Sequence, residues 1–185
     1  MKPLYDLSHL QPKRTLSPQD GMFWPGMEEQ YFDLGRRALE LVLFSAQLCD
    51  KPHYPDILDL PCGYGRVLRW LRAHYDYARI TACDLDRAAV DFCAKEFGAT
   101  PVYSQPDLRT LPFAAGFDLI WVGSLLTHLP RDQWLEALDC FVAGLEKQNR
   151  VMYPMVRKFV PFHEAGNAVI GEMRGDTDRV SRVSN

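Results

Sequence analysis

Short apolar runs alternate with helical patterns through the middle of the chain. Residues 56–60, 79–84 and 117–122 are apolar runs, and the last is continuous enough for a strand buried on both faces. Residues 64–74 and 87–97 follow the first two runs, with apolar side chains at the spacing of one helix face. Strands that alternate with helices favour a parallel sheet with right-handed crossovers. We therefore expect an α/β fold, a Rossmann-like, doubly wound and mostly parallel sheet with flanking helices.

The pattern before and after this alternation divides the chain further. Prolines interrupt residues 1–26 and predict an irregular arm. Residues 27–48 have helical spacing, with Tyr31, Leu34 and Ala38 on the expected buried face. A further strand is expected at 101–104, before the last apolar run, and a further helix at 131–146, after it.

The C-terminal part has a weaker pattern. Residues 151–156 are a candidate fifth strand, although Pro154 removes a backbone donor. The main domain is therefore taken as 27–156, followed by an atypical segment, 157–185, that ends in a frayed tail. A sheet abbreviated in this way leaves an unpaired edge. The apolar side chains of 157–170 are expected to cover that edge or to pair two chains in a homodimer.

Composition narrows the classes of protein to consider. The chain has 185 residues, 47% of them hydrophobic, and a net charge of −3, which suits one folded domain and gives no basic stripe for nucleic acid. No window has the roughly 18 apolar residues that span a membrane, and no leader is visible, so a cytoplasmic location is expected. Five widely spaced cysteines predict reduced thiols and no metal site.

Candidate chemistry lies in the loop after the first apolar run. In doubly wound sheets, ligands bind beyond the carboxyl ends of the strands. Gly63 and Gly65 allow a sharp turn and a close approach of a ligand to the backbone. Asp84 ends the next strand, 19 positions after Gly65, where a carboxylate can accept hydrogen bonds from both hydroxyls of a ribose. These features predict an adenosine-containing cofactor.

The glycine pattern separates two such cofactors. A nicotinamide fingerprint is G-x-G-x-x-G, with a helix N-terminus facing a pyrophosphate. This chain instead has Asp59 and Pro61 before the two glycines. It has Leu68 where the fingerprint has its third glycine. A carboxylate repels a pyrophosphate and attracts a cationic amino-acid cofactor. An NAD-dependent oxidoreductase remains as a hypothesis beside an enzyme that uses such a cationic cofactor.

Several motifs in order resemble the class I S-adenosylmethionine-dependent methyltransferases, from Ile57 through Leu145. The matching segments are the acidic glycine loop 58–67, the ribose-binding acid within 82–86, the loop 107–113 beside the adenine, and the fourth-strand motif 117–129. The resemblance implies S-adenosyl-L-methionine as the cofactor. The site residues that it implies are Asp59, Pro61 and Gly63 at the methionine end, Gly65 in the same loop, Asp84 at the ribose, Leu85, Asp107 and Leu108 at the adenine, and Gly123 and Ser124 at the sulfonium.

Two departures from the family pattern keep an alternative open. Pro61 replaces the first glycine of the family loop and has no N–H group. The chain after the candidate fifth strand is also short for the family's last helix and hairpin. The leading hypothesis is a methyltransferase that acts on a small-molecule or sugar-type acceptor. The alternative is a catalytically inactive S-adenosylmethionine-binding regulatory or partner protein.

Acid–base chemistry has one candidate. Methyl transfer requires the enzyme to position two reactants, with a base only where the acceptor must lose a proton. His128 follows the fourth strand and has an ordinary pKa near neutrality, so it is either the base or a packing residue. Aromatic side chains of the arm region form either a lid over the acceptor or an anchor for the arm; they are Tyr5, His9, Trp24 and Tyr31.

Overall fold

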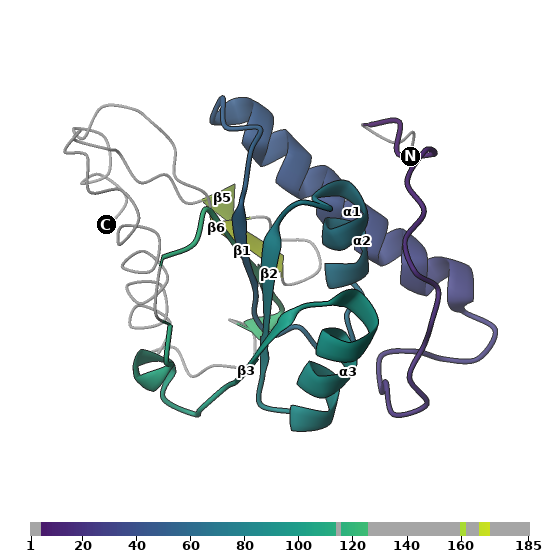
Figure 1. Cartoon of the computed structure of the whole chain (residues 1–185). Coiled ribbons are helices and arrows are strands. Elements are labelled where there is room, and N and C mark those ends of the chain that lie inside the picture. Colours follow the sequence, from purple (N-terminus) through teal and green to yellow (C-terminus); the bar gives the residue numbers. More distant parts are fainter. Residues whose placement is uncertain (1–4, 114–115, 126–159, 162–166, 171–185) are drawn as a thin grey trace, which may run out of the picture.

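One sheet with helices packed on one of its sides forms the described part of the chain. The computed structural model is described over residues 5–113, 116–125, 160–161 and 167–170. Helices α1 (Glu28–Leu48), α2 (Leu68–His74) and α3 (Arg87–Phe97) lie on the same side of the sheet, and the N-terminal arm runs along the outside of this helical layer (Figure 1). Residues 5–27 contain no helix or strand, as predicted from their prolines.

Four strands form the parallel part of the sheet. They are β1 (Asp56–Asp59), β2 (Arg79–Asp84), β3 (Thr100–Tyr103) and β4 (Leu119–Gly123). Their order is β3-β2-β1-β4, and each neighbouring pair is parallel. The sequence turns back across the sheet between β3 and β4, so β1 and β4 meet at the point where strand order reverses. The expected mostly parallel α/β sheet is confirmed.

Two short strands extend the sheet beyond β4. β6 (Asn167–Ile170) pairs antiparallel with β4, and β5 (Val160–Pro161) pairs antiparallel with β6. Part of the predicted 157–170 segment therefore covers the edge of β4 within the same chain, which is one of the two roles expected for it. The homodimer stays a prediction. The expected helix 131–146 and strand 151–156 lie outside the described residues.

Helix α3 has the boundaries that the sequence predicts. Asp86 is its N-cap, and the Asp86 carboxylate accepts hydrogen bonds from the backbone N–H groups of Ala88 and Ala89. Gly98 ends the helix in the left-handed conformation, with φ 63°. Helix α2 begins at Leu68 rather than at residue 64. The preceding residues form a loop in which Gly63 and Gly65 have positive φ, which a right-handed helix excludes.

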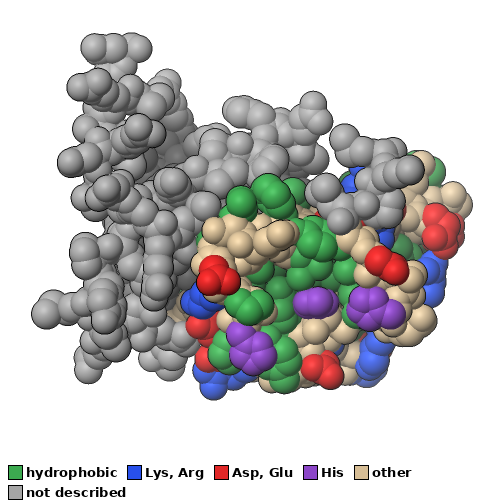
Figure 2. Space-filling view, turned by 90° about the horizontal axis from the view of Figure 1, so that it is seen from above, with side chains coloured by type: hydrophobic (Ala, Val, Ile, Leu, Met, Phe, Trp, Pro, Cys, Tyr) green, Lys and Arg blue, Asp and Glu red, His purple; other side chains and the backbone are tan. Residues whose placement is uncertain are grey.

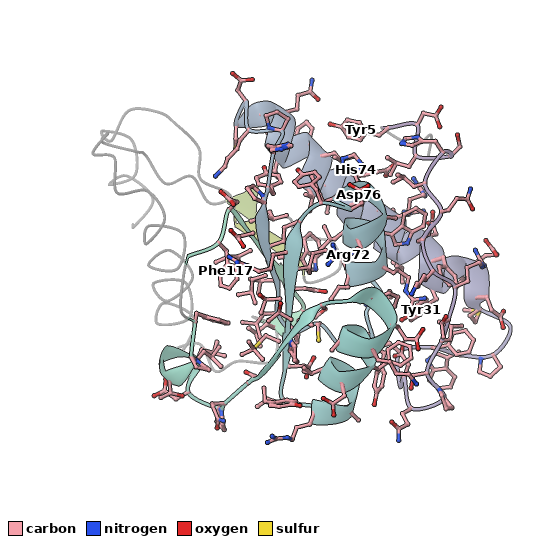
Figure 3. The ribbon with its side chains drawn as sticks, in the orientation of Figure 1. Tyr5, Tyr31, Arg72, His74, Asp76 and Phe117 are labelled. Atoms are coloured by element: carbon pink, nitrogen blue, oxygen red, sulfur yellow. The ribbon has the colours of Figure 1, made fainter. Side chains whose placement is uncertain are left out.

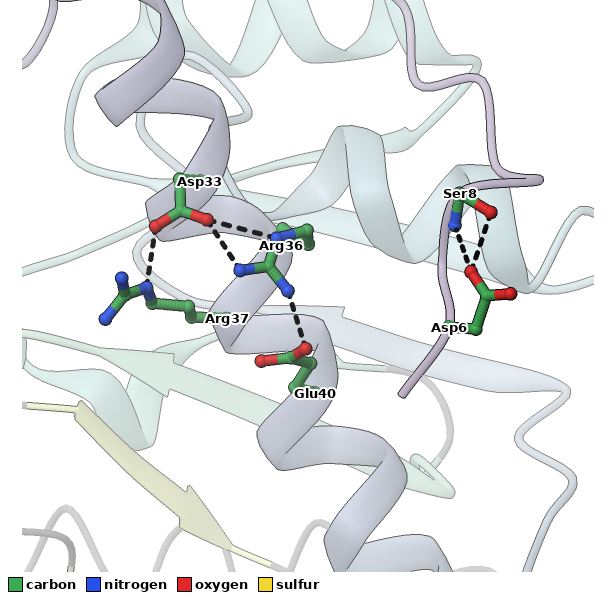
Figure 4. Close-up of polar contacts among 6 residues, drawn as sticks. All are labelled: Asp6, Ser8, Asp33, Arg36, Arg37 and Glu40. Carbon is green, nitrogen blue, oxygen red and sulfur yellow. Dashed lines mark hydrogen bonds and ion pairs between the residues drawn. The ribbon is translucent and has the colours of Figure 1, made fainter. Parts of the chain in front are cut away.

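Helix α1 packs with a face slightly different from the one predicted. Tyr31 and Ala38 are buried as expected, but Leu34 is 47% exposed. Gly35 takes the inward position instead, because a Cβ there would lie 2.2 Å from the carbonyl oxygen of Arg66. Ion pairs along the helix join Arg36 to Asp33 and to the buried Glu40, and Arg37 to Asp33 (Figure 4). Close packing at Gly35 brings α1 against the loop after β1.

The core has one cluster on each face of the sheet. Neighbouring side chains of a strand point to opposite faces, so Ile57 packs in the cluster with the helices and Leu58 in the other. Trp121 of β4 belongs to the helical side and is 1% exposed. Within the described residues, no helix is long and apolar enough to cross a membrane. The packed strands fix the carboxyl ends of β1, β2 and β4 as one edge.

Candidate functional site

A cavity of about 390 Å³ lies at the carboxyl ends of β1, β2 and β4. Four groups of residues line it. The end of β1 and the loop after it contribute Asp59, Pro61, Cys62, Gly63, Tyr64, Arg66 and Val67; β2 contributes Asp84; and β4 contributes Trp121, Gly123 and Ser124. The arm and the start of α1 contribute Asp20, Met22, Tyr31, Leu34 and Ala38. The residues from the loop after β1, β2 and β4 are called the floor, and those from the arm and α1 the outer wall.

Asp59 is the most unusual group of the floor. Its side chain is 1% exposed, and neither carboxylate oxygen has a hydrogen-bond partner among the described residues. Burial raises the pKa of Asp59 well above its ordinary value, and the nearby charge of Asp84 raises it further. A buried polar group without a partner costs free energy. This carboxyl is therefore suited to a ligand that brings a cation or a hydrogen-bond donor.

Asp84 joins the end of β2 to the loop after β1. One of its oxygens accepts from the backbone N–H of Gly63 at 2.8 Å, and the other accepts from that of Asp86 at 3.0 Å. A carboxylate has about four acceptor positions, so two remain for a ligand. Gly63 has φ 46°, in the left-handed region, and a Cβ there would meet no atom within 4 Å. The need for glycine at this position is therefore conformational.

The end of β4 closes the floor. Gly123 and Ser124 line the cavity beside Trp121. Ser124 has φ 62°, a conformation that residues other than glycine seldom adopt. Such backbone geometry persists where the surrounding structure holds it, often at a ligand site.

The outer wall is held by a short hydrogen bond between the arm and α1. The Tyr31 hydroxyl donates to an oxygen of Asp20 at 2.6 Å, and the backbone N–H of Met22 donates to the other oxygen at 2.9 Å. Asp20 is 7% exposed. Burial, and then the hydrogen bond to Asp20, raise the pKa of Tyr31 far above its ordinary value. Figure 3 shows Tyr31 beside the arm at the edge of the helical layer.

Arg69 ties this arm to the loop after β1. Its guanidinium donates to the carbonyl oxygens of Lys13 and Thr15 in the arm, and to those of Tyr64 and Gly65 in the loop. The residue is 1% exposed, and its cation also lies over aromatic rings of α1 and α3, at 5.1 Å from Phe32 and from Phe97 and 5.4 Å from Tyr31. One buried side chain therefore holds the two parts of the cavity together.

Six of the predicted site residues line this cavity, namely Asp59, Pro61, Gly63, Asp84, Gly123 and Ser124. Gly65 faces α3 instead, because a Cβ there would lie 2.4 Å from the Phe97 ring. Leu85 lies outside the cavity lining and is 63% exposed. Asp107 and Leu108 lie at the 3₁₀ turn Leu108–Thr110 (η1), also outside the lining. The roles predicted for all ten residues remain predictions.

The described histidines lie away from the cavity. His53 stacks on Tyr77 before β1, and His74 ends α2 beside Tyr75. These positions are at the amino ends of the strands, the face on which Figure 2 shows histidines among hydrophobic side chains. His128, the candidate base, lies outside the described residues. Of the four aromatic lid candidates, Tyr31 lines the cavity and Tyr5 bonds to Gln47 of α1, which anchors the arm.

Two residues of the outer wall, Asp20 and Met22, had no role predicted from the sequence. The positions of Asp20 and Met22, and of Arg69 beside the wall, depend on contacts between distant parts of the chain. One signal was available for Leu34, which lies one helical turn after Tyr31. In the part of the chain that the structure describes, no group of three His, Cys, Asp or Glu side chains is arranged to hold a metal ion.

The floor fits the cofactor that the resemblance implies. S-adenosylmethionine carries a sulfonium and an ammonium group, and the buried carboxyl of Asp59 lies in the cavity without a partner among the described residues. Asp84 retains acceptor capacity for ribose hydroxyls. The open space beside Gly63 allows a ligand to approach the backbone. Asp59, Gly63 and Asp84 are the residues that would hold this cofactor.

Comparison with curated proteins finds short similarities to another class. The chain is similar to the ATP-dependent zinc metalloprotease FtsH of Ralstonia pickettii, with 41% identity over 87 residues, which are 47% of this chain and 12% of that protein. The chloroplastic FTSH of Capsicum annuum is 32% identical over 127 residues, 69% of this chain and 18% of that protein. The chain therefore spans less than a fifth of the length of these relatives.

Comparison with solved structures supports the fold. The sugar N-methyltransferase KedS8 from Streptoalloteichus sp. ATCC 53650 has a TM-score of 0.52 and 17% identity to this chain. The similarity covers 80% of this chain and 62% of KedS8. At this identity the likeness concerns the fold.

A family model completes the comparison. Residues 57–148 match the model described as a methyltransferase domain, a range that begins in β1 and includes the glycine loop, Asp84 and all of β4. The match covers the same region in which the sequence motifs occur in family order. Motifs, sheet and family model agree that this chain belongs to the class I S-adenosylmethionine-dependent methyltransferases, with a Rossmann-like fold.

Proposed function

We propose that the chain binds S-adenosyl-L-methionine in the cavity and transfers its methyl group to a small-molecule or sugar-type acceptor. The observation that carries the proposal is the buried carboxyl of Asp59, which lines a cavity beside Asp84 and has no hydrogen-bond partner among the described residues. A cationic cofactor compensates the cost of burying such a group. The proposal also covers a cytoplasmic location and the absence of nucleic-acid and membrane partners.

The chain's own residues contribute attraction and position. When bound, the cofactor supplies a methyl group on a cationic sulfur, which an acceptor lone pair takes as the carbon–sulfur bond breaks and leaves a neutral thioether. Asp84 provides negative charge on the floor, and a bound cation favours the charged form of the Asp59 carboxyl, whose pKa burial raises. Trp121, Gly123 and Ser124 border the same space and limit the approach of water and acceptor. His128 is proposed as the base where the acceptor must lose a proton.

The sugar-type acceptor has limited support. One fold neighbour is named as a sugar N-methyltransferase, and the cavity volume of about 390 Å³ is within the range of small-molecule pockets. The inactive alternative shares the cofactor site and differs in turnover.

Zinc-dependent proteolysis, suggested by the names of the curated relatives, is not proposed. Many zinc proteases hold the metal with the two histidines of H-E-x-x-H on a helix. This chain has His163 and Glu164 followed by Asn167 at the position of the second histidine. Residues 162–166 lie outside the described residues, and Asn167 begins strand β6. The expected ligand set is incomplete in the sequence itself.

Calorimetric titration of the full chain tests the proposal, with S-adenosylmethionine, S-adenosylhomocysteine and NAD measured side by side. We expect both sulfur cofactors to bind and NAD to show no heat of binding. Binding of NAD in place of the other two would overturn the proposal. Binding without formation of S-adenosylhomocysteine from a broad acceptor panel would favour the inactive alternative.

A further inference from the structure

The outer wall of the cavity presents hydrogen-bond acceptors to a ligand. Tyr31 uses its one hydroxyl proton in the bond to Asp20, so the Tyr31 oxygen can only accept another hydrogen bond. The Asp20 carboxylate accepts from Tyr31 and Met22 and has further acceptor capacity. A ligand group that meets this wall must therefore supply N–H or O–H donors.

The charges around the cavity separate donors of different kinds. Asp20, Asp59 and Asp84 line it, and Arg66 is the cationic side chain among the described lining residues. A carboxylate or phosphate on the acceptor would face the carboxylates of Asp20 and Asp84 at an electrostatic cost. A basic amine gains from the same charges. The balance favours an amine over an anionic acceptor, and over an uncharged hydroxyl as well.

Apolar side chains line the cavity together with Asp20 and Tyr31. Met22 is 60% exposed and Leu34 is 47% exposed, and both line the cavity. Exposed hydrophobic side chains beside convergent polar groups are typical of a small-molecule site. They suit the carbon skeleton of an acceptor whose polar end reaches Asp20 and Tyr31.

We propose that Asp20, Tyr31, Met22 and Leu34 form the acceptor subsite, and that it takes a small molecule through a basic amine. This inference rests on the proposed methyltransferase function and specifies its acceptor class. The Asp20–Tyr31 pair holds the amine end through hydrogen bonds and charge. The apolar pair, Met22 and Leu34, contacts the rest of the molecule. The subsite and the floor line one cavity, so an amine held by the subsite lies in the cavity proposed for the cofactor.

Matched probes test this class on the full chain in the presence of S-adenosylhomocysteine. One series is 2-phenylethylamine, 2-phenylethanol and 3-phenylpropionate. The other is glucosamine, glucose and glucose 6-phosphate. Binding is followed by calorimetry and by ligand-observed NMR. We expect the amine of at least one series to bind at least about 10-fold more tightly than its hydroxyl and anionic partners.

Variants of the wall locate the binding. Asp20→Asn and Tyr31→Phe should each weaken amine binding by about 10-fold or more, with the affinity for S-adenosylhomocysteine retained. Glu29→Gln is the matched control, because Glu29 is on the same helix with its side chain 86% exposed and lies outside the cavity lining. It should leave amine binding unchanged. The retained cofactor affinity shows that each variant is folded.

Three results would overturn the inference. The first is a hydroxyl or anionic probe that binds more tightly than its amine partner. The second is amine binding that is equal in Asp20→Asn, Tyr31→Phe and the unchanged protein. The third is a protein that binds S-adenosylhomocysteine and none of the six probes, in which case the acceptor subsite fails and the cofactor site stands. Loss of S-adenosylhomocysteine binding in the unchanged protein would instead contradict the proposed function.

Discussion

The floor and the outer wall of the cavity are built in different ways. The floor consists of strand ends and a loop, joined by hydrogen bonds such as the one from Gly63, in the loop after β1, to Asp84 at the end of the neighbouring strand β2. The outer wall belongs to an arm without regular structure, and its bonds join residues far apart in the chain, from Lys13 to Arg69 and from Asp20 to Tyr31. A floor built on the sheet is fixed by the fold itself. The wall depends on a few individual side chains.

Arg69→Met should have the largest effect, because it removes the side chain that joins wall to floor. It leaves four carbonyl oxygens without their charged donor. We expect the free energy of unfolding to fall by about 3 kcal/mol or more, measured by urea denaturation. Arg37→Met is the control, since Arg37 is 57% exposed in a surface ion pair and should cost under about 1 kcal/mol. Equal losses in the two variants would contradict a wall held by Arg69.

Asp84→Ala probes the floor alone. The carboxylate is expected to bind ribose hydroxyls, so the affinity for S-adenosylhomocysteine should fall by roughly 1.5–3 kcal/mol in calorimetry. The fold should persist, because the β1–β2 ladder does not involve this side chain. Asp91→Ala, on the exposed side of α3, is the control and should bind normally. An unchanged affinity in Asp84→Ala would place the cofactor elsewhere.

Asp59→Asn tests how the buried Asp59 carboxyl makes the stability of the protein depend on pH. The folded-state pKa of Asp59 is raised by burial and then by the charge of Asp84, so the folded protein holds this proton more tightly than the unfolded chain. Stability should therefore fall as pH rises from the ordinary pKa of about 4 to the raised value, by about 1.4 kcal/mol for each unit of the shift.

The variant removes this pH dependence. Asp59→Asn should denature at higher urea concentration than the unchanged protein at neutral pH, with a flatter stability profile between pH 4 and 8. The exposed Asp76→Asn serves as the reference and should keep the original slope. A slope that survives in Asp59→Asn would assign the pH dependence to another group.

Asp86→Ala should have the smallest effect of the four. It removes the N-cap of α3 and the Tyr64 hydroxyl's partner at 3.1 Å, and we expect a loss of about 1 kcal/mol in the free energy of unfolding. Asp86→Asn keeps an oxygen that can cap the helix and should recover most of this loss. If neither variant changes the urea midpoint, the Asp86 cap contributes nothing measurable to the free energy of unfolding.

The same contrast explains what could be predicted from sequence. The alternation of strands and helices, the cap at Asp86 and the glycine turn are local signals, and the structure confirms the elements that they predict. The start of α2 was predicted four residues early because helical spacing continued through a loop whose glycines have positive φ.

Local patterns also left parts of the site without a prediction. Leu34 was expected in the core, and the close approach of Gly35 to Arg66 turns it toward the cavity instead. The role of Asp20 depends on the arm folding back onto α1, which no periodic pattern encodes. Hydrophobic periodicity reports burial against a regular element, and an irregular arm has no period to report.

The buried guanidinium of Arg69 has a consequence for the binding of two ligands. It holds the carbonyls of Tyr64 and Gly65 in the loop after β1, and those of Lys13 and Thr15 in the arm that leads to Asp20. A ligand that stiffens the loop reduces the motion of the arm through this one side chain, so the second partner pays less entropy on arrival. We therefore expect positive cooperativity between the nucleoside and the amine, each binding more tightly when the other is present.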